Sequence, residues 1–209
     1  LEAEEQKYLM KALHSGRIDP QGKSHYVQVL NFTIHPRFRG PFSNDLAVLE
    51  IPDAYPVDDS SIVEVSNVNI ESAYNRVVQV HGFGILSHGA NETNRAAYFK
   101  VRTVDMYLLP PARCQPDLGD LFKLDQHMCL KPKSNETLCF GFTGAPIILD
   151  GKLIGIVEFG HVSCSLEAPV VGMRLGAFGD FLGQVPYSFL DHIRDVFRNL
   201  MNRLMGIGW

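Results

Sequence analysis

The chain has 209 residues, of which 45% are hydrophobic and 20% charged, and its formal net charge is −4 at pH 7. A chain of this length buries one sizeable core or two smaller ones. The acidic balance argues against a nucleic-acid-binding protein, which would carry a basic patch or stripe. No apolar run approaches the roughly 18 residues that a membrane-spanning helix needs, so the sequence predicts no transmembrane segment.

Short β-strands are predicted along most of the chain. Residues 26–30 and 46–51 are rich in β-forming side chains. Further apolar runs, separated by turn signals, predict strands at residues 62–65, 77–80, 97–104, 145–149 and 152–159. Asp150-Gly151, between two of these runs, is the strongest hairpin signal in the chain. Several short strands at this spacing are typical of a β-sandwich or a β-barrel.

The C-terminus carries the one clear helical pattern in the sequence. Apolar residues from Phe189 to Met205 recur at spacings of three and four, and Gly206 follows as a stop signal. We expect this amphipathic helix to pack on its own domain. The alternative is that its last turns dock on a partner chain or on a membrane surface. The candidate partner-binding residues are Leu200, Met201, Leu204 and Met205.

Cysteines and glycosylation sequons point to the secretory pathway. Four cysteines lie in the second half of the chain, namely Cys114, Cys129, Cys139 and Cys164. They suit two disulfides, for which three pairings are possible, and they lack the close Cys-x-x-Cys pairs of a zinc site. N-glycosylation sequons begin at Asn31, Asn91 and Asn135. A secreted protein is therefore expected, with no metal and no cofactor; a cytosolic protein with accidental sequons is the alternative.

The segment of residues 139–146 carries the most functional information. Cys139-Phe140-Gly141-Phe142-Thr143-Gly144-Ala145-Pro146 resembles the Cys-x-Gly-Asp-Ser-Gly-Gly-Pro nucleophile loop of the chymotrypsin-like serine proteases. Phe159-Gly160 stands where that family has Trp-Gly, and Gly82-Phe83-Gly84 where it has Gly-Trp-Gly. His35-Pro36 and the run from Asn44-Asp45 to Leu49 resemble the segment that carries the triad aspartate. The ordered series covers most of the chain.

The resemblance implies an all-β fold, the chymotrypsin-like double six-stranded β-barrel, with the first barrel incomplete in this chain and an extended C-terminal α-helix. It divides the chain into residues 1–68 for the remainder of the N-terminal barrel, 69–185 for the C-terminal barrel, and 186–209 for the helix and tail. It pairs Cys114 with Cys129 and Cys139 with Cys164. A further family disulfide is replaced at both ends, near Val78 and Leu149, which we expect to pack together.

The same resemblance indicates a degenerate catalytic site. Asp45 takes the position that orients the base and Thr143 the position of the nucleophile, but nothing before residue 35 resembles the family's histidine strand. Phe142 replaces the aspartate that pairs with the new N-terminal ammonium, so the oxyanion N–H groups of Gly141 and Thr143 lack this ordering device. The base of the specificity pocket falls near Thr137, where no acidic residue stands.

These substitutions predict a secreted pseudoprotease that acts through protein–protein binding, as a regulator, a cofactor or a subunit of an extracellular assembly. The family's opening strands are not found in this sequence, so the expected protein partners include a cleaved N-terminal companion chain. Two alternatives stay open. One is an active hydrolase that uses Thr143 and a histidine from a companion segment. The other is a structural or membrane-associated subunit held by the C-terminal helix.

Overall fold

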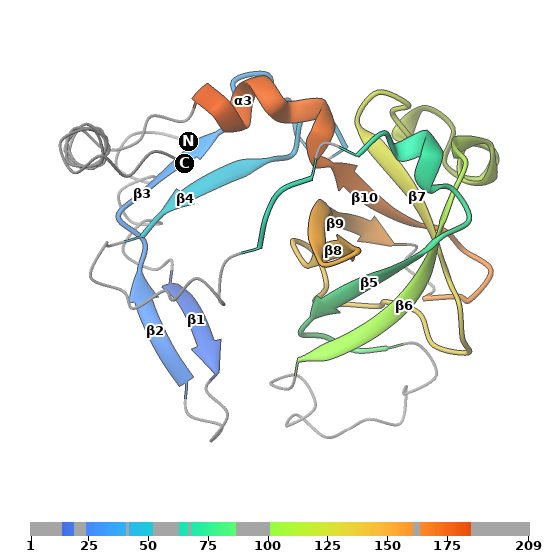
Figure 1. Cartoon of the computed structure of the whole chain (residues 1–209), viewed down its shortest axis with the longest axis horizontal. Helices are drawn as coiled ribbons and strands as arrows, with labels where there is room; N and C mark the ends of the chain where they lie inside the picture. The colour runs from blue at the N-terminus through green and yellow to red at the C-terminus, as the bar shows by residue number, and fades with distance from the viewer. Residues whose placement is uncertain are drawn as a thin grey trace, which may run out of the picture. The chain divides into compact units, whose positions relative to one another are not determined.

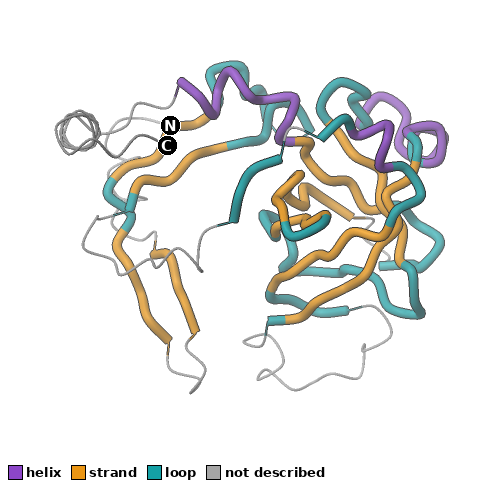
Figure 2. Tube along the Cα trace, viewed as in Figure 1, coloured by secondary structure: helices purple, strands orange, loops and turns teal. Residues whose placement is uncertain are grey.

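A computed structural model of the chain describes residues 14–18, 24–40, 42–51, 63–66, 68–86, 101–160 and 164–184. The chain divides into two compact units, residues 1–178 and 179–209. Strands make up most of the regular structure in the described part of the first unit (Figure 2). The all-β class that the resemblance implies is therefore confirmed.

Six strands in the second half of the first unit close into a barrel (Figure 1). Their order around the barrel is β10-β7-β6-β5-β8-β9, and all neighbouring strands are antiparallel. Closure removes the free edges that an open sheet would expose. The barrel strands are β5 (Val77–Gly82), β6 (Arg102–Leu109), β7 (His127–Pro132), β8 (Pro146–Leu149), β9 (Lys152–Gly160) and β10 (Val170–Arg174).

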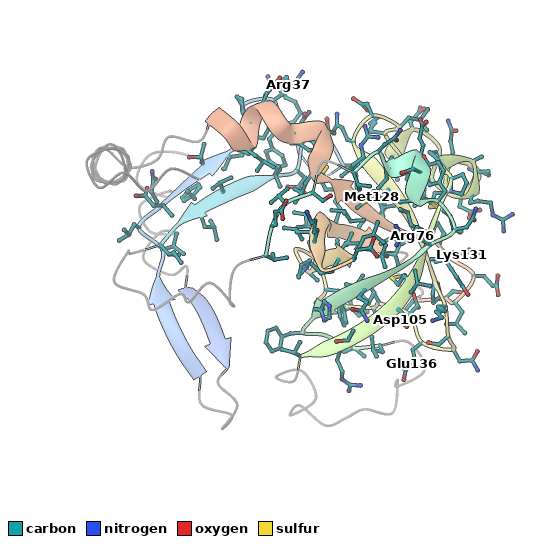
Figure 3. The ribbon with its side chains drawn as sticks, in the orientation of Figure 1. Arg37, Arg76, Asp105, Met128, Lys131 and Glu136 are labelled. Carbon is teal, nitrogen blue, oxygen red and sulfur yellow. A yellow bond between two sulfur atoms is a disulfide. The ribbon has the colours of Figure 1, made fainter. Side chains whose placement is uncertain are left out.

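Alternation along the strands directs apolar side chains into the barrel. In β6, Val104, Met106 and Leu108 are buried while the residues between them are more exposed. The barrel interior leaves no room for a side chain at Gly155 of β9, because a Cβ there would collide with the side chain of Met128. Figure 3 shows the side chains of the barrel, with Met128 labelled. The core thus has the dense packing of a folded protein interior.

The hairpin predicted at Asp150-Gly151 is confirmed. Strands β8 and β9 pair with Leu149 opposite Lys152, so the two residues between them form the turn. Their φ angles are +51° for Asp150 and +76° for Gly151. Positive φ at both central residues is the conformation that Asp-Gly hairpins favour.

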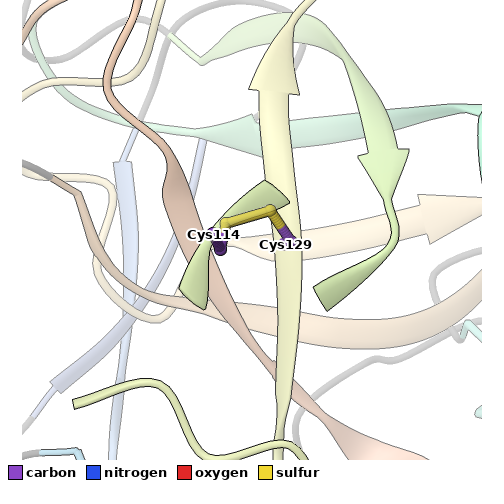
Figure 4. Close-up of a disulfide and its surroundings, with 2 residues drawn as sticks. All are labelled: Cys114 and Cys129. Carbon is purple, nitrogen blue, oxygen red and sulfur yellow. A yellow bond between two sulfur atoms is a disulfide. The ribbon is translucent and has the colours of Figure 1, made fainter. Parts of the chain in front are cut away.

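Both disulfides implied by the resemblance are present. Cys114 and Cys129 are 5.6 Å apart at their Cα atoms and tie the segment before α2 (Gln115–Leu118) to β7 (Figure 4). Cys139 and Cys164 form the second bridge. Val78 and Leu149, where the further family bridge is absent, are buried in one hydrophobic cluster as expected.

Several strand predictions need correction. The run at residues 62–65 forms no described strand; only Val65 makes a single parallel bridge, with Leu153. Strand β6 begins at Arg102 and runs to Leu109, later than the predicted 97–104, of which the first four residues lie outside the described part. Strands β7 and β10 were not predicted. Their patterns are weak because Gly172 interrupts β10 and Lys131-Pro132 end β7.

The part of the chain before the barrel contains two separate two-stranded antiparallel sheets. One sheet pairs β1 (His14–Ile18) with β2 (Ser24–Gln28), and the other pairs β3 (Asn31–Ile34) with β4 (Ala47–Glu50). Strands β1 and β3 were not predicted because both are short and carry polar residues. A two-stranded sheet is marginally stable by itself, so these strands rely on further contacts.

Short helical segments connect the strands. They are η2 (Ile70–Ala73), η4 (Pro111–Arg113), α2, η5 (Gly119–Leu121), η6 (Leu175–Phe178) and, in the second unit, α3 (Gly179–Gln184). Within the described residues, no helix has the length and apolar character to cross a bilayer. The predicted helix over residues 186–209, with its partner-binding candidates, lies outside the described part, and the division of the chain at residues 68 and 185 stays a prediction.

Candidate functional site

The loop that carries Thr143 is anchored in the core by the side chain before it. The ring of Phe142 is 1% exposed and belongs to the main hydrophobic cluster of the barrel. Two glycines lie against the ring: a Cβ on Gly82 would be 2.9 Å from Phe142 Cδ1, and a Cβ on Gly84 would be 2.6 Å from Cδ2. Gly84 also has a φ of +152°, which side-chain-bearing residues rarely adopt. Phe142 and the Gly-Phe-Gly segment are therefore complementary in shape.

Backbone hydrogen bonds hold both sides of this loop. The Ile85 N–H donates to the Phe140 carbonyl at 2.9 Å, and the Cys139 N–H donates to the Ile85 carbonyl at 3.0 Å. After the turn, the Gly144 N–H donates to the Val157 carbonyl on β9 at 2.7 Å. The loop thus joins β9 and the residues after β5, and its conformation depends on packing and backbone pairing.

Thr143 itself stands at the surface. Thr143 is exposed, and its hydroxyl makes no hydrogen bond with any residue that the structure describes. The N–H groups of Gly141 and Thr143, the expected oxyanion donors, likewise donate to no described residue. Two free N–H groups can bind an anion or a carbonyl oxygen, whereas a nucleophile also needs a base within hydrogen-bond reach.

The histidines whose side chains are described have contacts elsewhere. His35 is buried in its turn, where its Nδ1 accepts a hydrogen bond from the Arg37 N–H at 3.2 Å. His81 Nδ1 lies 2.9 Å from Thr103 Oγ1 on the next strand. Burial, and then the Arg37 charge, lower the pKa of His35 below its ordinary value. Neither ring has a hydrogen bond to Thr143.

Asp45, the predicted orienting carboxylate, is within electrostatic range of a second acidic residue that sequence reasoning missed. Asp45 is half-buried, and burial followed by the negative charge of Glu158 raises its pKa above the ordinary value. Glu158 is on β9 and is only 8% exposed. Its signal in the sequence is an acidic residue within the apolar run of residues 153–159. A charge in such a strand predicts either a partner or a functional role.

The partner of Glu158 is His127, at the start of β7. Glu158 Oε2 lies 2.9 Å from His127 Nε2, an ion-pair distance without the alignment of a hydrogen bond, and the two side chains are 5% and 0% exposed. His127 Nδ1 accepts a hydrogen bond from the Lys123 N–H at 3.0 Å. In the neutral ring the proton is therefore on Nε2, facing Glu158. Glu158 is thus held in a buried pair within the barrel, and its charge acts on Asp45.

The remaining site predictions fall in different surroundings. Thr137, near the predicted pocket base, is 1% exposed, whereas Asn135 in the same sequon is exposed. Asn31 is also exposed, at the start of β3. Asn91 lies outside the described residues, as do Leu200, Met201, Leu204 and Met205. Within the described ranges, no group of three or more His, Cys, Asp or Glu side chains is arranged to hold a metal ion.

Comparison with known proteins gives a consistent result. The family profile described as Trypsin matches residues 7–182. The chain is 24% identical over 170 residues to a trypsin of Phaedon cochleariae, covering 78% of this chain and 62% of that protein. It is 26% identical over 159 residues to brachyurin of Leptuca pugilator, covering 75% and 67% respectively.

A solved structure shares the fold. Neuropsin, described as a serine protease expressed in the limbic system of mouse brain, superposes with a TM-score of 0.64 at 15% identity. The match covers 77% of this chain and 72% of that one. The chain thus spans about two thirds of the length of the proteins it resembles.

Proposed function

The chain belongs to the trypsin family, and we propose that it acts as a secreted, non-catalytic member that works through protein–protein binding. The observation that carries this proposal is the burial of Phe142 in the core. An acidic residue at this position in the family pairs with a new N-terminal ammonium and orders the oxyanion loop. A phenyl ring cannot accept that ion pair, and here its packing takes over the anchoring role.

The surroundings of Thr143 and Asp45 support the same proposal. The Thr143 hydroxyl has no hydrogen bond to any described residue, so nothing in the described part prepares it for attack. Burial, and then the negative charge of Glu158, raise the pKa of Asp45, which weakens Asp45 as an anion for orienting a base. Removing members of such a triad lowers turnover by about 10⁴–10⁶-fold.

Exposed aromatic side chains beside the loop support a role in binding. Phe140 is 61% exposed and Phe83 is 40% exposed. Their backbones are neighbours, because the Phe140 carbonyl accepts from the Ile85 N–H and a Cβ on Gly141 would lie 3.1 Å from the Phe83 carbonyl oxygen. Aromatic side chains of this kind are enriched in protein interfaces.

The test compares the wild-type chain with Thr143→Ala in two assays. The first follows cleavage of a varied panel of peptide substrates, and the second follows labelling by a fluorophosphonate probe. We expect no turnover and no labelling above background in either protein. Turnover or labelling that disappears in Thr143→Ala would overturn the proposal and favour the threonine-nucleophile hydrolase.

Binding is tested by chemical cross-linking of the chain in the native secretion, followed by mass spectrometry. We expect cross-links to one protein that weaken in Phe140→Ser. An equal yield of cross-links from the wild type and from Phe140→Ser would place the binding surface elsewhere. A chain truncated after residue 198 tests the alternative in which the C-terminal helix holds an assembly or a membrane: unchanged assembly and partitioning would exclude it.

A further inference from the structure

The turn of residues 123–127, which leads into β7, is closed by the side chain of its last residue. The Lys123 N–H donates to His127 Nδ1 at 3.0 Å, and the His127 N–H donates back to the Lys123 carbonyl at 2.8 Å. The Gln126 N–H donates to the same carbonyl at 3.1 Å. Only the first of these three bonds depends on a side chain. The ring of His127 therefore supplies the acceptor for the Lys123 N–H, which donates to no other described residue.

The ring of His127 is fixed on its other sides as well. Its side chain is 0% exposed, and its Nε2 lies 2.9 Å from Oε2 of Glu158, whose side chain is 5% exposed. The rings of Phe122 and Phe159 meet it edge to face, with centroid distances of 5.5 and 6.2 Å. Each ring nitrogen thus has its own neighbour, Lys123 for Nδ1 and Glu158 for Nε2, and aromatic rings flank the imidazole.

The loop that leads into this turn is held at both ends by bonds that do not involve the ring. The disulfide between Cys114 and Cys129 holds its start. At its end, the Arg174 N–H of β10 donates to the Gln126 carbonyl at 2.7 Å. Residues 119–124 lie between these two anchors. Loss of the bond to His127 would therefore act on this middle part of the loop and leave its ends attached to the barrel.

The bond from Lys123 requires a neutral imidazole. In the neutral ring one nitrogen donates and the other accepts, whereas in the imidazolium both nitrogens are donors. Because Nδ1 accepts from the Lys123 N–H, a second proton on the ring goes to Nδ1 and faces that N–H across 3.0 Å. Two donors cannot share a hydrogen bond, so the bond is lost. The contact of Nε2 with the Glu158 carboxylate is kept, since a charged donor binds a carboxylate more strongly.

The other charged groups around the ring have contacts of their own. The charged residues on the neighbouring elements are Glu158 on β9, Arg174 on β10, Asp120, Lys123 and Asp125 in the loop, and Asp45 before β4. Arg174 directs its Nη2 to the Asp125 carbonyl at 2.8 Å, and the Asp125 carboxylate accepts from the side-chain amide of the next residue at 3.3 Å. Among the described residues, Glu158 is the charged group that meets the ring, so it alone offers a partner to a protonated Nε2.

We propose that His127 is a proton-operated latch on the loop of residues 119–124. The neutral ring holds the loop through the Lys123 N–H, and the protonated ring stays with Glu158 and releases Lys123. The latch therefore opens on the acid side, and closes again when the ring gives up its second proton. This inference does not depend on the binding role proposed above, because it concerns a loop other than the one that carries Thr143.

The test is an NMR titration of the ¹⁵N-labelled 209-residue chain that follows the His127 ring and the Lys123 N–H together. At neutral pH we expect the ring nitrogen shifts of a tautomer with its proton on Nε2. As the ring takes up its second proton, the Lys123 N–H should lose protection against hydrogen exchange by about fivefold or more, the factor that one ordinary hydrogen bond is worth. Exchange rates are corrected for their intrinsic pH dependence. The Arg174 N–H should keep its protection, which shows that the barrel is still folded.

Two variants separate the latch from general effects of acid. In His127→Asn the amide oxygen can replace Nδ1 as an acceptor and does not titrate, so the protection of the Lys123 N–H should be the same across the pH range. His81→Asn, the matched change at a histidine of β5 that lies 2.9 Å from Thr103 Oγ1, should retain the wild-type profile.

Three results would overturn the proposal: a ring proton on Nδ1 at neutral pH, a ring that stays neutral until the barrel unfolds, or a Lys123 N–H whose protection does not follow the ring. If His127→Asn fails to fold, the wild-type titration decides the question, because coincident midpoints for the ring and the Lys123 N–H support the latch and separate midpoints overturn it.

Discussion

Replacing Phe142 by alanine tests whether hydrophobic packing anchors the loop of residues 139–145. The ring is 1% exposed, so the substitution removes nearly all of its buried apolar surface. An aromatic side chain buries about 150 Å² or more, which at about 25 cal/mol per Å² corresponds to about 4 kcal/mol. Phenylalanine-to-alanine changes in cores cost about 3–5 kcal/mol. We expect Phe142→Ala to lower the free energy of unfolding by this amount.

The upper part of that range is expected because the cavity cannot close easily. Gly82 and Gly84 border the ring without side chains that could move into the space. The Cys139–Cys164 bridge and the backbone bonds of Ile85 limit inward movement of the loop. The cost of a core truncation grows with the volume that stays empty.

Denaturant unfolding with the disulfides intact measures the difference. The matched control is Phe140→Ala, the same change two residues earlier, where the ring is 61% exposed and the expected loss is within about 0.5 kcal/mol. A second comparison uses Gly82→Ala, whose Cβ would crowd the ring of Phe142. The loss of unfolding free energy caused by Gly82→Ala should be smaller in the Phe142→Ala protein than in the wild type. A loss below about 1.5 kcal/mol for Phe142→Ala, or equal losses at both positions, would refute this account of the loop.

Three further predictions concern pH, the surface and glycosylation. Folding lowers the pKa of His35, so the neutral ring contributes stability above the ordinary histidine pKa, and this stability is lost as the pH falls through the lowered pKa. His35→Asn should remove this loss of stability in acid from the unfolding profile. Asp150→Asn should change the free energy of unfolding by less than about 1 kcal/mol, because the ion pair with Arg76 is exposed (Arg76 47%, Asp150 65%) and asparagine also tolerates the turn. A larger loss in denaturant unfolding would contradict this. Expression in a secreting host should add a glycan at the exposed Asn135, and an Asn135→Gln protein of unchanged electrophoretic mobility would argue against it.

Local patterns predicted the features that depend on neighbours in the sequence. The Asp150-Gly151 turn was predictable because two adjacent residues with positive φ need residue types that tolerate it. Strands β5, β8 and β9 were predicted near their observed positions because apolar runs flank clear turn signals. Strand β10 escaped prediction, because Gly172 is placed there by the size of side chains from other strands.

The resemblance assigned family positions to Asp45, Phe142 and Thr143, yet it left their surroundings open. That Phe142 is accommodated by Gly82 and Gly84 depends on a contact between segments about 60 residues apart. In the sequence these glycines belong to a different motif. Shape complementarity of this kind becomes visible only when the chain is folded.

The sequence by itself determined the family, the strand-rich character, the disulfide partners that the family implies, and the presence of Phe142-Thr143 where the family's nucleophile loop has Asp-Ser. Each of these depends on residue identity or on order along the chain. The tertiary structure alone decided that Glu158 and His127 form a buried pair and that the charge of Glu158 acts on Asp45. Charge–charge repulsion and burial depend on distance in space, and the turn of residues 35–46 and strands β7 and β9 bring these groups together from separate parts of the chain.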